Sequence, residues 1–147
     1  MKITIEHLDI QENEIILRCR NLDDEILSIL SMLKTQSQKL CVWSEEGEKE
    51  LIFLTPDVIL YGESVDERIY LYGTEQVYRS ARTLAELCDR YEDVGYVRVS
   101  KSMIVNLHQI RRLKSCGSGR IEAAMKNDEK IMISRHYAPL LRQKLGV

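Results

Sequence analysis

Paired cysteines are missing from this sequence, since no two of its four cysteines form a Cys-x-x-Cys motif. Zinc sites and dithiol redox motifs usually begin with such a pair, so the spacing argues against both. Long apolar runs are missing too: no stretch approaches the roughly 18 residues of a membrane span, and the N-terminus lacks the apolar core of a signal peptide. These absences predict a cytoplasmic protein with structural or incidental free thiols at Cys19, Cys41, Cys88 and Cys116.

Catalytic motifs are also missing. The sequence has no Gly-x-Ser-x-Gly elbow, no P-loop and no His-Glu-x-x-His pair. His108 and His136 have no Asp, Glu or Cys at a spacing typical of a metal site or a catalytic dyad. We therefore expect no enzyme, no metal ion, no cofactor and no small-molecule substrate.

The two parts of the chain have opposite net charges: basic residues are scarce in the first part, and acidic residues in the second. Residues 98–147 hold eleven Lys and Arg against three Asp and Glu, whereas residues 1–97 hold ten against twenty. The formal net charge of −2 therefore hides a basic C-terminal third. Such an asymmetry indicates a polyanionic partner, most often nucleic acid.

The first 38 residues predict a small β-β-α extension. Residues 2–6 alternate in polarity, residues 14–20 are rich in β-formers, and Asp23 and Asp24 precede apolar residues at helical spacing. The polar stretch 35–38 marks the expected boundary. This extension is acidic, and the apolar face of its helix has to pack on the same chain or on a second copy, so we expect a packing or dimerisation unit.

Residues 39–147 predict a mainly β domain with short helices, in the α+β class. Thr83 and Glu86 have the spacing of a capping box and open a helix that runs to Arg90. Residues 120–125 and 130–133 predict a hairpin, and residues 137–145 a last helix that ends at Gly146. Further short strands with frequent turns indicate an antiparallel meander, at residues 39–43, 50–54, 58–61, 68–72, 76–79, 96–99 and 103–105.

Residues 51–147 resemble the LytTR family, the DNA-binding output domain of many bacterial regulators. Four segments in order carry the resemblance: residues 59–64, 83–87, 98–106 and 130–135. The resemblance is greatest to stand-alone transcription regulators that carry an N-terminal β-β-α extension. A receiver domain would need roughly 120 residues, which do not fit before Leu51.

The resemblance implies an elongated domain of antiparallel strands that sets loops into successive major grooves and bends the DNA. It implies a sequence-specific transcription regulator, with double-stranded DNA as its partner. Repeated half-sites would suit a homodimer. A small membrane protein is a further partner that only the resemblance suggests.

Carrying the family's contact positions onto this sequence gives three loops, with candidate DNA-binding residues Arg68, Lys101, Ser102 and Arg135. Asp66 and Glu67 depart from the family's first loop, because carboxylates repel phosphate. The three basic candidates each have a plainer alternative: Arg68 as an ion-paired surface residue, Lys101 as part of a simple turn, and Arg135 as an exposed residue after a Ser134 helix cap. A cation at a helix N-terminus is unfavourable alone and attracts an anion, which favours Arg135 as a contact.

A charge run adds non-specific candidates. Arg111, Arg112 and Lys114, near Arg120, are expected to neutralise phosphates. Asn106 and Ile110 are expected to be structural, at a turn and in the core.

The alternative function is a protein–protein interaction module with no nucleic-acid binding, in which acidic and basic parts pair between molecules. Salt dependence separates the two, since binding through several phosphates weakens by orders of magnitude as salt rises.

Overall fold

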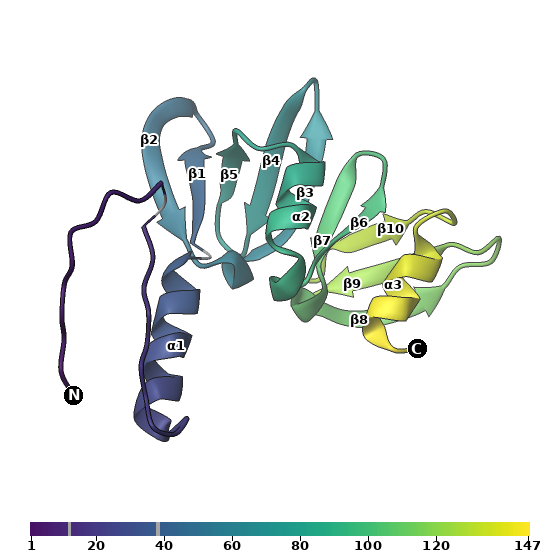
Figure 1. Cartoon of the computed structure of the whole chain (residues 1–147). Coiled ribbons are helices and arrows are strands. Elements are labelled where there is room, and N and C mark those ends of the chain that lie inside the picture. Colours follow the sequence, from purple (N-terminus) through teal and green to yellow (C-terminus); the bar gives the residue numbers. More distant parts are fainter. Residues whose placement is uncertain (12, 38) are drawn as a thin grey trace. The chain divides into compact units, whose positions relative to one another are not determined.

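Residues 35–147 form two antiparallel sheets with short helices, and residues 1–34 form a separate unit. This arrangement comes from a computed structural model of the chain, which describes residues 1–11, 13–37 and 39–147 (Figure 1). Within this described part, no helix is long and apolar enough to cross a membrane.

The larger sheet has seven strands in the order β2-β1-β5-β4-β3-β7-β6. Hairpins join β1 to β2 and β6 to β7, and β3, β4 and β5 form a meander. β3 also pairs with β7, which joins the meander and the β6–β7 hairpin in one sheet. The strands are β1 Leu40–Ser44, β2 Gly47–Leu54, β3 Ile59–Val65, β4 Arg68–Gly73, β5 Val77–Ser80, β6 Tyr96–Ser100 and β7 Met103–Asn106.

The smaller sheet has three strands in the order β10-β9-β8: β8 Ile110–Ser115, β9 Ile121–Met125 and β10 Lys130–Ile133. Short 3-10 turns lie at Pro56–Val58, Glu92–Val94 and Leu107–Gln109. The α-helices of the described residues are α1 Asp24–Ser37, α2 Leu84–Arg90 and α3 Ala138–Leu145.

Two hydrophobic cores lie on opposite faces of the strands β3, β7 and β6. Ile59, Tyr96 and Ile104 belong to a core that α2 covers, while their neighbours Leu60, Val97 and Val105 belong to a core shared with the smaller sheet and α3. Successive residues of a strand point to opposite faces, so these strands carry apolar residues at neighbouring positions, such as Ile59 and Leu60 or Tyr96 and Val97. The second of these cores holds the two sheets of residues 35–147 together, and the first fixes α2 on the larger sheet.

Several local predictions are confirmed. Thr83 Oγ1 accepts from the Glu86 N–H at 3.2 Å, and both halves of the capping box are present at the start of α2. Ile121, Ile131 and Ile133 share the buried face of the β9–β10 hairpin. α3 begins at Ala138, one residue later than predicted, and ends at Leu145, with Gly146 as its C-cap at φ 74°.

Asn106 is structural, as predicted, because it is buried and its amide bonds two segments. Its Nδ2 donates to the Ile59 carbonyl at 3.0 Å, and its Oδ1 accepts from the His108 N–H at 3.1 Å. The amide ties the start of β3 to the end of β7. Ile110 packs against the core beside the smaller sheet.

The two predicted strands of the extension, residues 2–6 and 14–20, are wrong. The described residues before α1 form no strand, and Ile3 and Ile5 are each 80% exposed. Alternation favours a strand only where another strand can accept its backbone hydrogen bonds, and the described part of residues 1–22 supplies none. The helix of the extension is confirmed, and Asp23 Oδ1 caps it by accepting from the Ile26 N–H at 3.0 Å.

Two features of the domain also differ from the prediction. The sheet is not a simple meander, because β7 lies beside β3 and the β1–β2 hairpin lies beside β5. The strand β8 was not predicted, since its sequence reads as a charge run. Edge strands tolerate such charges, because one side of the strand faces water.

Candidate nucleic-acid interface

The three loops that the sequence predicts to contact DNA lie side by side. The Ser64 N–H donates to the Ser102 carbonyl at 2.8 Å, which ties the β3–β4 hairpin to the β6–β7 hairpin. The Ser134 N–H donates to the Val99 carbonyl at 2.9 Å, which ties the β10–α3 connection to the end of β6. We call these three segments, residues 65–68, 100–103 and 134–137, the loop edge (Figure 1).

Strand pairing explains why these loops meet. Antiparallel pairing of β3 with β7 sets Glu63 opposite Met103, so the end of one strand lies beside the start of the other. A register shift between Arg98 and Ser100 lies in β6, the last strand of the sheet. The Val99 carbonyl at this irregularity therefore accepts from Ser134, outside the ladder.

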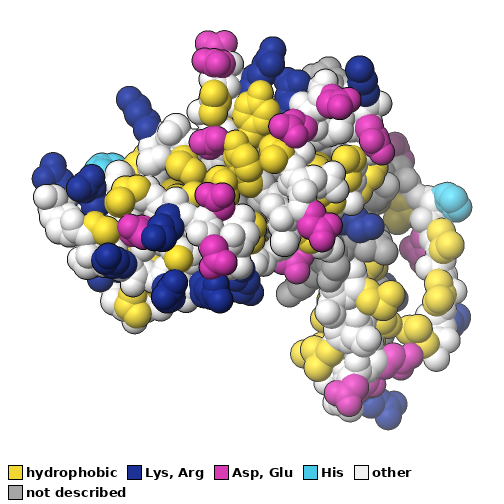
Figure 2. Space-filling model, turned by 180° about the vertical axis from the view of Figure 1, so that it is seen from behind, with side chains coloured by type: hydrophobic (Ala, Val, Ile, Leu, Met, Phe, Trp, Pro, Cys, Tyr) yellow, Lys and Arg dark blue, Asp and Glu magenta, His cyan; other side chains and the backbone are white. Residues whose placement is uncertain are grey.

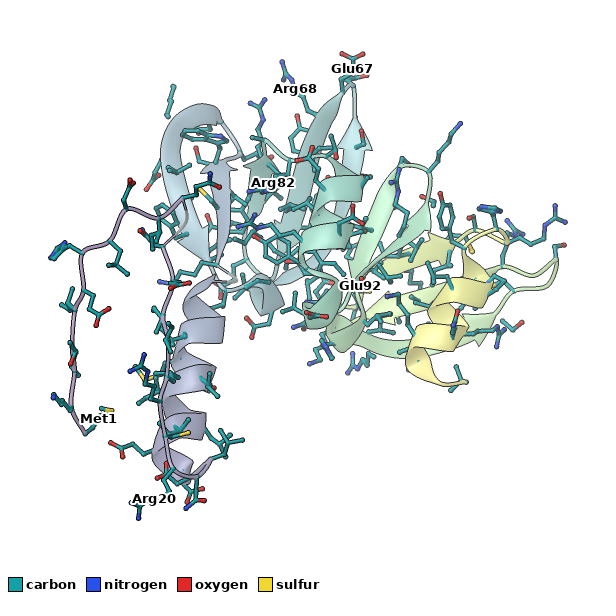
Figure 3. All side chains as sticks on the ribbon, viewed as in Figure 1. Met1, Arg20, Glu67, Arg68, Arg82 and Glu92 are labelled. Atoms are coloured by element: carbon teal, nitrogen blue, oxygen red, sulfur yellow. The ribbon has the colours of Figure 1, made fainter. Side chains whose placement is uncertain are left out.

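The β3–β4 tip is acidic. Asp66 and Glu67 are its two central residues, with φ 50° and 64°, as a tight hairpin turn requires. Arg68 is exposed and follows them at the start of β4. Figure 3 shows the side chains of Glu67 and Arg68 at the tip of the hairpin, directed away from the sheet. The single cation of this tip therefore lies beside two carboxylates.

The β6–β7 tip is basic, and the Arg98 side chain bonds its backbone. Lys101 and Ser102 are exposed, and no ion pair of Lys101 occurs among the described residues. The Arg98 guanidinium donates from Nε to the Ser100 carbonyl at 2.9 Å and from Nη2 to the Lys101 carbonyl. The Ser102 N–H also donates to Ser100 Oγ at 3.3 Å. Backbone groups of this turn are therefore bonded within the domain, while the side chains of Lys101 and Ser102 are exposed.

The β10–α3 connection presents Arg135. The Ser134 carbonyl, instead of its side chain, accepts from the N–H groups of Tyr137 and Ala138, each at 3.0 Å. Arg135 is exposed, and its stem lies on the β8–β9 loop, where a Cβ on Gly119 would come within 2.8 Å of Arg135 Cγ. Gly119 has φ 76°, so two requirements favour glycine there. A side chain at position 119 would therefore push against the Arg135 stem.

The Glu63 carboxylate, in β3 just before the acidic tip, is held within the sheet. The Tyr72 hydroxyl donates to Glu63 Oε1 at 2.5 Å, and the Tyr72 ring stacks on Tyr61 at 4.5 Å between centroids. Burial, helped by the hydrogen bond to Glu63, raises the pKa of Tyr72 far above its usual value. Tyr72 therefore keeps its proton at neutral pH and remains a donor to Glu63.

The predicted charge run lies elsewhere, on the smaller sheet. Arg112 and Lys114 are exposed and pair with Ala124 and Glu122, which alternate with the buried residues of β9, so they lie on the outer face. Lys130 joins them there through its pairing with Ala124. Figure 2 shows Lys and Arg side chains gathered over this end of the domain, at the left of that view.

These cations differ in whether an acidic side chain lies close enough to form an ion pair with them. Arg111 Nη1 lies 2.5 Å from Asp128 Oδ1, and Lys130 Nζ lies 3.8 Å from Glu122 Oε1. Within the described residues, Arg112 and Lys114 form no ion pair. They are therefore better placed than Arg111 to neutralise phosphates.

The structure thus separates the predicted residues into two groups. Arg68, Lys101, Ser102 and Arg135 share the loop edge, and the charge run lies on the smaller sheet. Sequence reasoning missed Arg98, although one signal was available: it is a charged residue between the buried Val97 and Val99. In the described residues, no group of three His, Cys, Asp or Glu could hold a metal ion.

Cationic side chains gathered on loops of a β-rich scaffold are typical of a polyanion-binding domain. The chain belongs to the LytTr DNA-binding domain family, whose model matches residues 49–146. The resemblance seen in the sequence is thereby confirmed.

Curated relatives agree with this assignment. The chain is 25% identical over 103 residues to the sensory transduction protein LytT of Enterococcus faecalis, covering 69% of this chain and 42% of that protein. It is 28% identical over 101 residues to the LytT protein of Bacillus subtilis, covering 69% and 42%. The chain therefore spans less than half the length of these relatives.

A solved structure shares the fold. A LytTr DNA-binding domain from Bacillus cereus aligns with a TM-score of 0.67 at 22% identity, covering 75% of this chain and 98% of that one. The predicted mainly β fold with short helices is confirmed.

Proposed function

We propose that this chain is a sequence-specific transcription regulator that reads the major groove of DNA with the loop edge. Family membership supports DNA binding over the alternative of a protein-only interaction module. The observation that carries the mode of reading is the pair of backbone hydrogen bonds, from Ser64 to Ser102 and from Ser134 to Val99, that joins three loops into one edge. Binding chemistry alone, without catalysis, is proposed for this surface.

Each part of the surface has a chemical role in this proposal. Arg135 carries a forked donor that matches the O6 and N7 acceptors of guanine in the major groove, and Lys101 and Ser102 donate to base edges or to a nearby phosphate. Arg112 and Lys114 neutralise phosphates without reading sequence. Arg68, beside Asp66 and Glu67, contributes at the border of the contact.

The proposed partner is double-stranded DNA with repeated half-sites, bound by a homodimer in the cytoplasm. Two copies on two half-sites gain affinity through their link. Residues 1–38 are proposed as the dimerisation unit, since exposed apolar side chains such as Ile15 and Ile16, 69% and 65% exposed, remain for a second copy to cover. Deleting these residues is expected to lower the oligomeric state and the operator affinity together.

Fluorescence anisotropy tests the proposed function. The full chain is titrated into the duplex from upstream of its own gene and into a scrambled duplex, at two salt concentrations. We expect tighter binding to the native duplex, affinity that falls with salt, and no preference in Arg135→Ala. Arg142→Ala, which removes an exposed arginine from α3, is the matched control and should keep the preference. Failure to bind either duplex at low salt would restore the interaction-module alternative.

A further inference from the structure

Arg98 is a charged side chain in an apolar strand, and its contacts go to a turn of the loop edge. Its neighbours Val97 and Val99 are 2% and 0% exposed, and Arg98 itself is half-buried. It pairs with Ile104, which belongs to the core under α2. The alternation of the strand therefore directs Arg98 to the α2 side. Burial raises the pKa of Cys88 in α2 to about 11, and the positive charge of Arg98 acts against this rise.

The guanidinium is directed along the strand toward the turn. Nε donates to the Ser100 carbonyl at 2.9 Å, and Nη2 donates to the Lys101 carbonyl. Two adjacent carbonyls of one turn thus accept from one rigid, planar group. The Ser102 carbonyl of the same turn accepts from the Ser64 N–H at 2.8 Å, so this turn is also the junction between the two hairpins.

We propose that Arg98 is a positioning residue for sequence recognition, which fixes the β6–β7 turn so that Lys101 and Ser102 meet the bases in one geometry. This inference rests on the proposed function. Arginine suits the task because its donors lie in one plane at fixed angles, whereas lysine offers a single flexible ammonium group. A turn that loses this support keeps its charges, and so keeps its attraction to phosphate, but loses the fixed geometry that base contacts require.

The test compares Arg98→Met and Arg98→Lys with wild type and with Arg90→Met. Arg90 ends α2 beside Tyr91, whose ring packs against Tyr96 at the opposite end of β6, so this control removes one cation without touching the turn. Anisotropy gives the ratio of affinities for operator and scrambled duplex, and the dependence of each on salt. Amide hydrogen exchange of Ser64, whose N–H donates to the Ser102 carbonyl, reports the turn itself without DNA.

Arg98→Met is expected to lower the affinity ratio about tenfold, on the scale of one lost base contact, while affinity for the scrambled duplex and the salt slope stay unchanged. The Ser64 amide should exchange faster. Arg98→Lys should fall between wild type and Arg98→Met, and Arg90→Met should match wild type.

Three outcomes would overturn the inference. An unchanged ratio in a folded Arg98→Met would show that the turn needs no support. Equal losses on both duplexes, with a salt slope smaller by about one, would make Arg98 a phosphate contact. If Arg98→Met does not fold, Arg98→Lys carries the test, and a wild-type ratio and Ser64 exchange rate would reject the proposal. Failure of the wild-type chain to bind any duplex would instead reject the proposed function, and Ser64 exchange would still report on the turn.

Discussion

The two hairpin tips of the loop edge have similar architecture and opposite chemistry. Each has two residues between paired strands, and the Ser64–Ser102 hydrogen bond links them. One tip places Asp66 and Glu67 beside Arg68, and the other places Lys101 between two serines. Arg98 bonds the second tip from within the domain, and no such bond to the turn carbonyls of the first tip is seen among the described residues.

Under the proposed function, this difference would make one edge both attractive to DNA and selective in how it binds. Cations at the β6–β7 tip and the β10–α3 connection favour contact with DNA, while carboxylates at the β3–β4 tip oppose close approach of phosphate there. Repulsion that disfavours wrong placements is a recognised source of specificity. We therefore expect the contact to be concentrated on the part of the edge formed by Lys101, Ser102 and Arg135.

The largest expected effect is that of Arg135→Ala. Loss of a forked donor to guanine should weaken operator binding by about 1–3 kcal/mol and relax specificity at one position of the half-site. Anisotropy on duplexes with single base changes measures this. Because lysine lacks the forked donor of arginine, Arg135→Lys should recover only part of the loss. An unchanged preference across the whole series would remove Arg135 from the reading surface.

Lys101→Ala should have the next largest effect. Removing this exposed cation is expected to weaken binding by roughly 1 kcal/mol, with a smaller salt slope if its contact is a phosphate and a reduced base preference if it reads a base. Titration at four salt concentrations on operator and scrambled duplex distinguishes these roles. Lys126→Ala, in the β9–β10 turn, removes a cation away from the loop edge and is the control.

A double substitution at the acidic β3–β4 tip directly tests its contrast with the basic β6–β7 tip. Asp66→Asn with Glu67→Gln removes two negative charges and should raise affinity for every duplex about threefold at low salt, as the repulsion is lost. Asparagine tolerates the left-handed conformation at position 66, so the turn should persist. Glu46→Gln in the β1–β2 turn is the matched control. Unchanged or weaker binding would mean that the acidic tip is not a repulsive border.

Arg68→Ala should have the smallest effect. With two carboxylates beside it, the guanidinium is expected to contribute less than about 0.5 kcal/mol to binding, as exposed charges commonly do. In the Asp66→Asn, Glu67→Gln background the same substitution should cost more, because the neighbouring carboxylates no longer offset its charge. Isothermal titration of the four variants, wild type included, gives the coupling, and a large loss in the single variant would contradict the asymmetry of the two tips.

The sequence predicted best where the deciding contacts are local. The Thr83–Glu86 capping box and the Ile121, Ile131 and Ile133 face depend on residues close in the chain or on a tight hairpin, and both are confirmed. Residues 2–6 and 14–20 have equally clear strand patterns, but a strand also needs a partner, which the pattern does not supply. For the same reason, the sequence did not predict that β3 pairs with β7, because this pairing joins residues about forty positions apart.

The sequence predicted which loops form the candidate interface, but not the hydrogen bonds that join them. Resemblance to a family selected the three loops, and the structure shows that they lie together. Nothing in the sequence indicates that Ser64 and Ser134 join the loops through backbone N–H groups, since every residue except proline has one. Arg98 was missed because a charge between two valines identifies an unusual residue without showing what it bonds.

Chemical protection of guanine N7 tests the central claim most directly, because N7 lies only in the major groove. The full chain is bound to its operator and treated with dimethyl sulfate, beside Arg135→Ala at a concentration that keeps the DNA occupied. Reading by the loop edge predicts protected guanines in each half-site, with at least one protection lost in Arg135→Ala. Guanines that stay fully reactive in the occupied wild-type complex would contradict it.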